Sequence, residues 1–230
     1  MKHRSVKTGK LKRAGFGTTS KAAIAVGVGI AVLALFSWFN NQGIRPASTD
    51  SASATTSDAL AGKFAFQVGI PGPGQEAPPI RLVSNDGSTF DLTNLRGKTV
   101  LLYFQEGVTC QPCWDQIKDV EHGFQAFRAL GIDTVVTVAI DPIDLLKQKA
   151  ADSVLLAPVL SDPGAVVSKA YHANDYGMMG KSRDGHTFIV VGPDGRIRWR
   201  ADYGGAPNYT MYLPVQNLVA DIRQGLAKAN

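Results

Sequence analysis

The chain has 230 residues, which is room for one domain of ordinary size with appendages but not for two. Its 44% hydrophobic and 19% charged residues are typical of a globular protein. The formal net charge of +5 is unevenly distributed, because seven of the 24 Lys and Arg residues, and no acid, lie in residues 1–21. The rest carries 17 basic against 19 acidic residues, so the basic character belongs to the N-terminal tail.

A basic tail can bind nucleic acid, but this one runs directly into an uncharged apolar stretch at residues 22–39. As a helix its 18 residues would reach about 27 Å, close to the roughly 30 Å of a hydrocarbon core. Trp38 and Phe39 fall where an interfacial aromatic belt belongs. We therefore predict a cytoplasmic tail at residues 1–21, a signal-anchor helix in the lipid bilayer at 22–39, an extracytoplasmic remainder, and no nucleic-acid partner.

A cleaved secretory signal is the alternative, since Ala52-Ser53-Ala54 offers a small-residue cleavage site. This site lies far beyond the apolar stretch, whereas signal cleavage normally follows it closely, so a retained anchor is favoured. Residues 40–75 are rich in Ser, Thr, Ala, Gly and Pro. This composition predicts a flexible linker, followed by the domain at residues 76–230.

The domain opens with the signals of a β-hairpin, because two short strand-like runs, 80–83 and 88–91, flank Asn85-Asp86-Gly87. Residues 99–105 form a continuous apolar run, which predicts a strand buried on both faces. This strand leads directly to the cysteines.

Beyond the cysteines, helical and strand-like patterns alternate. The predicted elements are helix 114–130, strand 132–140, helix 142–151, strand 158–160, helix 164–171, strands 187–191 and 197–201, and helix 214–227. The last two strands flank Gly192-Pro193-Asp194-Gly195 and must pair antiparallel, whereas strand–helix–strand crossovers are usually parallel. The pattern predicts an α/β fold with a central mixed β-sheet flanked by helices.

The two cysteines, Cys110 and Cys113, stand as Cys-Gln-Pro-Cys where the buried strand meets a helix. Free backbone N–H groups at a helix start favour a thiolate, and Pro112 suits the first helical turn. Residues three apart share one helix face, so the pair can close into a disulfide. We predict that Cys110 attacks a disulfide and that Cys113, one turn deeper, resolves the mixed disulfide.

Two other uses of the pair fit less well. An inert structural disulfide would close so short a loop that it removes little entropy from the unfolded chain. A zinc site is incomplete, because a single CxxC has neither a second pair nor a His-x₃₋₅-His partner. We therefore expect catalytic cysteines without metal or cofactor, acting on protein thiols or disulfides outside the cytoplasm, with a membrane-bound or soluble electron donor.

Several segments carry a family resemblance. They are Ala77-Pro78-Pro79-Ile80, Asp86-Gly87, residues 95–102, the Cys110 to Cys113 motif, Thr187-Phe188-Ile189-Val190 and Pro193-Asp194-Gly195. Together they resemble the redoxin branch of the thioredoxin superfamily, which includes TlpA/ResA-type tethered thioredoxins and AhpC/TSA-type peroxiredoxins. The resemblance implies a thioredoxin-like fold and a thiol–disulfide oxidoreductase.

The chain departs from both groups near the cysteines. Thr109 stands where tethered thioredoxins usually have Trp, and Gly185-His186-Thr187-Phe188 occupies the place where a cis-proline would face the cysteines. Peroxiredoxins place Thr or Ser three residues before the peroxidatic cysteine, where this chain has Gly107, and Arg183 is only a loose candidate for their peroxide-orienting arginine. A thiol peroxidase with antioxidant activity is therefore the alternative to disulfide exchange.

A second alternative is copper binding, because SCO-type assembly proteins resemble this layout of an anchor, two cysteines and a later histidine, here His186. Their cysteine spacing is CxxxC rather than CxxC. The other residues considered as candidates are expected to have no catalytic role. Glu106 is interpreted as a solvated loop carboxylate, Met178-Met179 as packing, Trp114 as packing beside the cysteines, and His122 and His172 as surface residues.

Overall fold

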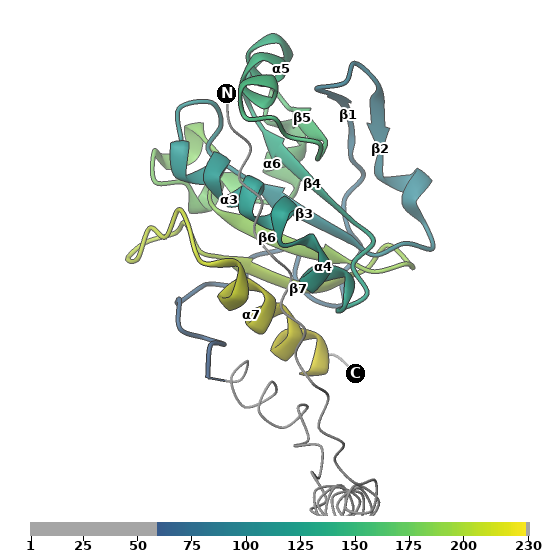
Figure 1. Cartoon of the computed structure of the whole chain (residues 1–230), viewed down its shortest axis with the longest axis vertical. Helices are drawn as coiled ribbons and strands as arrows, with labels where there is room; N and C mark the ends of the chain where they lie inside the picture. Colours follow the sequence, from purple (N-terminus) through teal and green to yellow (C-terminus); the bar gives the residue numbers. More distant parts are fainter. Residues whose placement is uncertain (1–58, 229–230) are drawn as a thin grey trace, which may run out of the picture. The chain divides into compact units, whose positions relative to one another are not determined.

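The computed structural model of the chain describes residues 59–228 (Figure 1). The predicted tail at 1–21, the predicted anchor at 22–39 and the first part of the predicted linker lie outside these residues. Within residues 59–228, no helix combines the length and the apolar character needed to cross a membrane.

A seven-stranded sheet forms the centre of the described domain, in the order β2-β1-β5-β4-β3-β6-β7. The strands are β1 (Arg81–Ser84), β2 (Thr89–Asp91), β3 (Val100–Phe104), β4 (Thr134–Ala139), β5 (Val159–Ser161), β6 (Thr187–Val191) and β7 (Ile197–Asp202). β3, β4 and β5 run parallel to one another, and the other neighbouring pairs are antiparallel. The predicted mixed sheet and the opening hairpin β1–β2 are confirmed.

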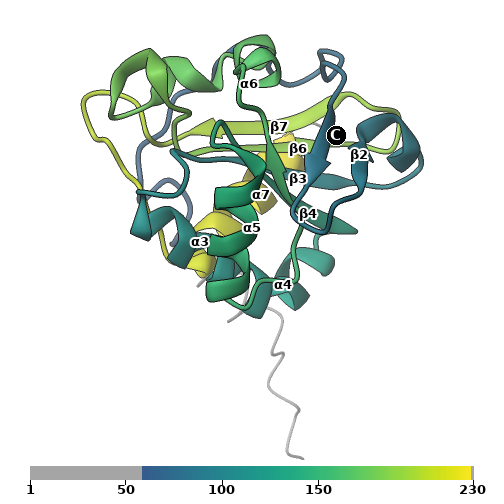
Figure 2. The same ribbon diagram turned by 90° about the horizontal axis from the view of Figure 1, so that it is seen from above.

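Helices cover both faces of this sheet (Figure 2). The described helices are α3 (Gln111–His122), α4 (Phe124–Arg128), α5 (Ile143–Asp152), α6 (Val166–Ala170), α7 (Val215–Lys228) and the short 3₁₀ helices η1 (Leu92–Leu95), η2 (Ala173–Tyr176) and η3 (Gly180–Ser182). Figure 2 shows α3, α5 and α7 on one side of the sheet and α6 on the other. This arrangement is the thioredoxin-like fold implied by the family resemblance.

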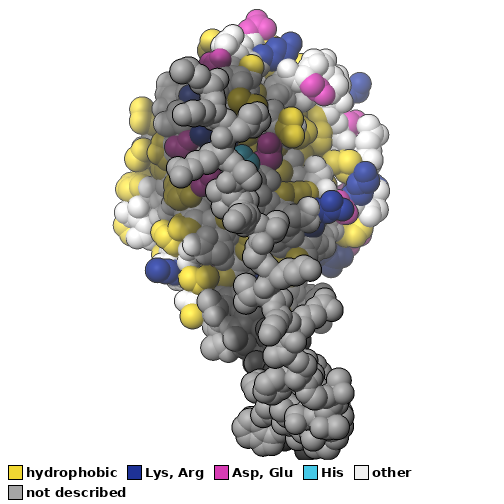
Figure 3. Space-filling view, viewed as in Figure 1, with side chains coloured by type: hydrophobic (Ala, Val, Ile, Leu, Met, Phe, Trp, Pro, Cys, Tyr) yellow, Lys and Arg dark blue, Asp and Glu magenta, His cyan; other side chains and the backbone are white. Residues whose placement is uncertain are grey.

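The central strand β3 explains the two hydrophobic cores. All five of its residues are buried, as its continuous apolar run predicts. Because side chains alternate along a strand, Leu101 and Tyr103 join the core beneath α3, α5 and α7, whereas Leu102 and Phe104 join the core that includes α6. On the surface that Figure 3 shows, Lys and Arg side chains lie among Asp and Glu side chains, in keeping with the balanced charge beyond the tail.

The helix predicted at 114–130 is divided into α3 and α4 at Gly123. The Gly123 N–H still donates to the carbonyl of Asp119, but its ψ of 11° ends the regular turn. A Cβ at this position would approach Val215 of α7 to 3.0 Å. Glycine is a poor helix former. The close approach of α7 favours glycine at this position, and the weak helix propensity of glycine favours a break between α3 and α4.

Residues 59–75, assigned by the sequence to the flexible linker, instead pack on the domain. Gln67 pairs with Asp202 of β7 in an antiparallel bridge. The Phe66 ring lies 5.2 Å from the ring of Tyr203, and Asn217 of α7 donates to the Leu60 carbonyl. The domain therefore begins before residue 76. The linker composition concealed this start, because its contacts depend on β7 and α7, more than a hundred residues away in sequence.

A buried ion pair fixes part of this segment. Arg200 and Asp202 on β7 are both fully buried and form two hydrogen bonds of 2.8 Å. The Asp202 carboxylate also accepts the N–H of Gly69, and Arg200 donates to the carbonyl of Pro71. Every charged atom of the pair has a partner, which is the condition for tolerating buried charge.

We expect Arg200→Leu to lower the free energy of unfolding by about 3–5 kcal/mol, because the Asp202 carboxylate would stay buried without its cation. Urea denaturation measures this loss, and hydrogen exchange should show faster opening at Gly69. Arg198→Leu is the matched control on the same strand. Its ion pair with Asp194 is exposed, so its loss should cost no more than about 1 kcal/mol. Equal losses in the two variants would contradict the role of the buried pair.

Candidate active site

Cys110 lies at the junction where β3 leads into α3. It is the N-cap residue of α3, and Pro112 occupies the first helical turn, as predicted. The backbone N–H of Cys113 donates to the Cys110 sulfur at 3.3 Å. This N–H group and the positive end of the helix dipole therefore face the Cys110 sulfur, and such an arrangement favours a thiolate.

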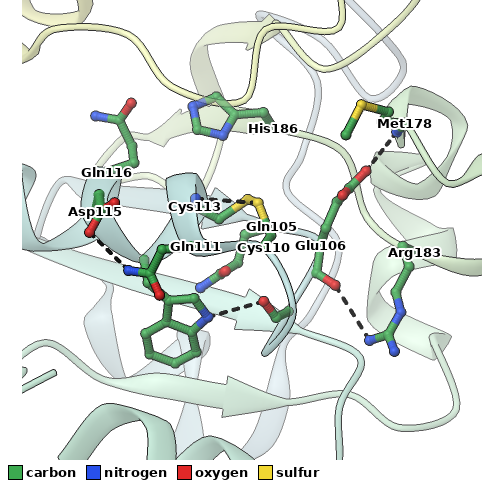
Figure 4. The surroundings of a disulfide bond; sticks show 12 residues. Gln105, Glu106, Cys110, Gln111, Cys113, Asp115, Gln116, Met178, Arg183 and His186 are labelled. Carbon is green, nitrogen blue, oxygen red and sulfur yellow. Dashed lines mark hydrogen bonds between the residues drawn. A yellow bond between two sulfur atoms is a disulfide. The ribbon is translucent and has the colours of Figure 1, made fainter. Parts of the chain in front are cut away.

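Cys110 and Cys113 form a disulfide in the structure, with Cα atoms 5.3 Å apart (Figure 4). Cys110 retains 8% of its surface and Cys113 none. The order of exposure is the predicted one, but Cys110 is more covered than a freely exposed helix start would be. Only Cys110 offers surface to a reactant from solvent.

The loop between β3 and the cysteines is held by the carboxylate of Asp141, which follows β4. One carboxylate oxygen accepts a hydrogen bond from the backbone N–H of Val108 at 3.0 Å. The other accepts a hydrogen bond from the Arg183 guanidinium at 2.7 Å. Gly107 has a φ of +99°, and a Cβ there would overlap the Asp141 carboxylate. Trp114 completes the arrangement by donating its indole N–H to the Gly107 carbonyl at 3.0 Å, so it packs beside the cysteines as predicted.

Glu106 is buried rather than solvated, which corrects the interpretation from sequence. It has 5% exposure, and its Oε1 accepts the backbone N–H groups of Met178 and Met179 at 2.7 and 3.3 Å. The two methionine side chains are themselves 51% and 66% exposed, so they do not fill a packing gap. The N–H groups of the segment before η3 therefore satisfy the carboxylate, an arrangement that local sequence does not reveal.

His186, in the segment that the sequence places at the cis-proline position, lies near the disulfide (Figure 4). Its side chain is fully buried, and its Nδ1 lies 2.8 Å from the hydroxyl of Tyr103. The same hydroxyl lies 3.5 Å from the carbonyl oxygen of Cys113. Burial lowers the pKa of His186 from 6.5 to about 3, so the imidazole is neutral at physiological pH.

The structure brings some of the predicted site residues together and leaves others apart. Arg183 reaches the cysteine loop, but it binds Asp141 and the Glu106 carbonyl, and no hydrogen bond from it to either sulfur is present among the described residues. His122 and His172 are on the surface, as predicted. Residues 59–228 contain no group of three or more His, Cys, Asp or Glu side chains arranged to hold a metal ion.

Sequence reasoning missed Asp141 and Tyr103. Asp141 follows β4, which is parallel to β3 and directly beside it. Because the carboxyl ends of parallel strands meet at one edge of a sheet, this position was the available signal. Tyr103 was counted as part of an apolar run, which conceals a hydroxyl group.

A buried carboxyl pair lies close to this site. The hydroxyl of Ser168 is 2.8 Å from Asp162 and 2.9 Å from Asp184. One hydroxyl proton cannot serve both contacts, so the second contact needs a proton on a carboxyl group. Burial, with Asp162 nearby, raises the pKa of Asp184 from 3.8 to about 8, which places this proton on Asp184.

The comparison with family models decides the family. Residues 73–200, more than half of the chain, match the AhpC/TSA family. The chain belongs to this family.

Individual members of the AhpC/TSA family are also similar. A Mycobacterium tuberculosis protein with a peroxiredoxin name is 32% identical over 130 residues, covering 54% of this chain and 81% of the relative. Peroxiredoxin Bcp of Escherichia coli is 27% identical over 127 residues, with the same coverage of both chains. Among solved structures, Peroxidoxin BcpB of Mycobacterium tuberculosis has a TM-score of 0.53 at 18% identity and covers 69% of this chain and 96% of its own.

The family match and the cysteine pair both indicate redox chemistry at a thiol. The protein is a thiol-based oxidoreductase of the redoxin branch, with a thioredoxin-like fold. The structural likeness, at 18% identity, supports the fold alone.

The protonated carboxyl group predicts a pH dependence of stability. Because the pKa of Asp184 is raised on folding, its contribution to stability is fully present below about pH 4 and is lost as the pH rises through about 8. The free energy of unfolding of Asp184→Asn, measured with urea, should fall less steeply over this range than that of the parent chain. Asp194→Asn is the exposed control and should keep the parent slope. Identical slopes for Asp184→Asn and the parent would contradict a proton on Asp184.

Proposed function

We propose that this AhpC/TSA family member exchanges disulfides through a two-cysteine cycle in which Cys110 attacks and Cys113 resolves. The observation that carries the proposal is the position of the Cys110 sulfur at the start of α3, where it accepts the N–H of Cys113 and belongs to the only residue of the pair with exposed surface. The attacking group in disulfide exchange must be a thiolate that a second disulfide can reach.

The cycle balances without a cofactor. The Cys110 thiolate attacks one sulfur of a substrate disulfide, forming a mixed disulfide and releasing one substrate thiolate. The Cys113 thiol then loses its proton and attacks the Cys110 sulfur, which closes the disulfide seen in the structure and releases the second substrate thiolate. The substrate is reduced by two electrons, and a dithiol donor must return two electrons to the pair.

Peroxide reduction is the second candidate, and the comparisons favour it because relatives carry peroxiredoxin names. The Cys110 thiolate would attack a peroxide oxygen and become a sulfenic acid as an alcohol or water leaves. The Cys113 thiol would then displace water from this sulfenic acid and close the same disulfide. Against this candidate, Gly107 stands where peroxiredoxins have Thr or Ser, and Arg183 is bound to Asp141.

We further propose that residues 22–39 anchor the protein in the cell membrane as a single span, with residues 1–21 cytoplasmic and the redox domain outside. The support is the charge asymmetry around an uncharged stretch of 18 residues. The substrates would then be protein thiols or disulfides outside the cytoplasm. A membrane-bound or soluble dithiol protein would supply electrons.

The two candidates differ in the substrate that the reduced protein consumes faster. We expect insulin disulfides to be reduced faster than hydrogen peroxide at equal concentration, because Cys110 lies in a thiolate-stabilising cap without the peroxiredoxin hydroxyl three residues earlier. Stopped-flow measurement with each substrate gives the ranking. Faster consumption of peroxide would replace disulfide exchange by the second candidate.

Cysteine variants serve as controls in the same assay. Cys110→Ser should abolish both reactions, since it removes the attacking sulfur. Cys113→Ser should retain the attack and accumulate stable mixed disulfides, because nothing resolves them. Mixed disulfides that form only with Cys110→Ser would show that Cys113 is the attacking residue.

The proposed topology predicts accessibility from one side of the membrane. Protease added to intact spheroplasts should digest the redox domain, and alkaline carbonate should leave the full-length chain in the membrane pellet. Cleavage as a secretory signal would instead release a shortened soluble chain. A domain protected from protease would contradict the extracytoplasmic location.

A further inference from the structure

Three of the buried residues that have a polar atom without a partner lie around the disulfide. Among the described residues, the buried side-chain atoms that lack a hydrogen-bond partner are Gln105 Oε1, Gln116 Nε2, Asp184 Oδ1 and His186 Nε2. Figure 4 shows Gln105, Gln116 and His186 around the cysteine pair. An unpaired polar atom in the interior costs free energy, so a native structure that retains several at one place calls for an explanation.

The imidazole of His186 is fixed from several sides. Nδ1 is bound to Tyr103, and the ring meets the rings of Tyr103, Phe188 and Tyr203 edge-on, at centroid distances of 5.0, 5.2 and 6.4 Å. The ring therefore has little freedom to rotate towards another partner. Nε2 is the one polar atom of this side chain that remains available, and the low pKa keeps the ring neutral.

Reduction introduces a thiol proton at the cysteine pair. In the disulfide, neither sulfur carries a proton. When the bond opens, Cys110 has the helix start to stabilise its thiolate, whereas the Cys113 sulfur has no exposed surface and remains a thiol. A buried S–H group is a weak donor, which an acceptor inside the protein can orient. A carbonyl oxygen can only accept, so the hydroxyl of Tyr103 donates to the carbonyl of Cys113, 3.5 Å away, and accepts the N–H of His186 Nδ1. In this arrangement Nε2 is the unprotonated acceptor of the ring.

We propose that His186 is a positioning residue whose Nε2 accepts the S–H of Cys113 in the reduced protein. This inference rests on the proposed role of Cys113 as the resolving thiol. The hydrogen bond would hold the thiol protonated and oriented until Cys110 is engaged in a mixed disulfide. A neutral acceptor suits this task better than a carboxylate, because it would not draw the proton away before the resolving step.

His186→Phe tests the proposal, because a phenyl ring fits among aromatic neighbours but offers no acceptor. We expect the equilibrium of the full-length chain with dithiothreitol to shift about tenfold towards the disulfide, which corresponds to a potential about 30 mV more negative. Tyr203→Phe is the matched control, since it removes a buried hydrogen bond to Asp221 from the same aromatic group. It should shift the equilibrium less than about twofold, even if stability falls. Equal shifts in the two variants, or none, would overturn the proposal.

A second measurement needs no variant and no substrate. With ¹⁵N-labelled histidine, chemical reduction of the parent chain should move the Nε2 resonance of His186 towards that of a hydrogen-bonded acceptor, with the ring neutral from about pH 5 to about 8. A His186 resonance that does not respond to reduction would overturn the proposal. Because the reductant is chemical, this result is independent of whether the protein prefers disulfides or peroxides. Failure of the proposed cycle would appear instead as unchanged activity in the cysteine variants.

Discussion

The carboxylate of Asp141 is the contact on which the geometry of the site depends. It binds the N–H of Val108 in the cysteine loop and the guanidinium of Arg183, and so joins the end of β4, the loop after β3 and the segment before β6. Gly107 is required beside it, because any Cβ would occupy the space of the carboxylate. With the loop fixed in this way, Cys110 arrives at the helix start in the orientation of an N-cap, and its sulfur receives the N–H of Cys113.

The same segment before β6 serves the site from a second direction. Its backbone N–H groups at Met178 and Met179 bind Glu106, and its last residue before β6 is His186. The protonated Asp184 lies within it and contacts Ser168 of α6. A charge on Asp184 would face Asp162 in the interior, so the protonation of this carboxyl group bears on how firmly the segment stays in place.

Sequence patterns were sufficient for the parts of the site that depend on neighbours in the chain. The apolar run of β3, Pro112 in the first turn and the spacing of Cys110 and Cys113 all act within a few residues, so they could be interpreted without a fold. Glu106 could not, because its burial is set by Met178 and Met179, more than seventy residues away. The start of the domain was missed for the same reason, since the partners of residues 59–75 lie on β7 and α7.

Disulfide exchange and peroxide reduction share their second half, in which the Cys113 thiol closes the bond with Cys110. They differ in what must reach the Cys110 sulfur. With 8% of its surface exposed, Cys110 admits a small oxidant directly, whereas a protein disulfide must be presented on a segment that can extend to the helix start. The exposed side chains of Met178 and Met179 lie on the segment that binds Glu106, four residues before Cys110, and offer apolar surface to such a segment. Access to Cys110, rather than the resolving step, is therefore the property that separates the two candidate reactions.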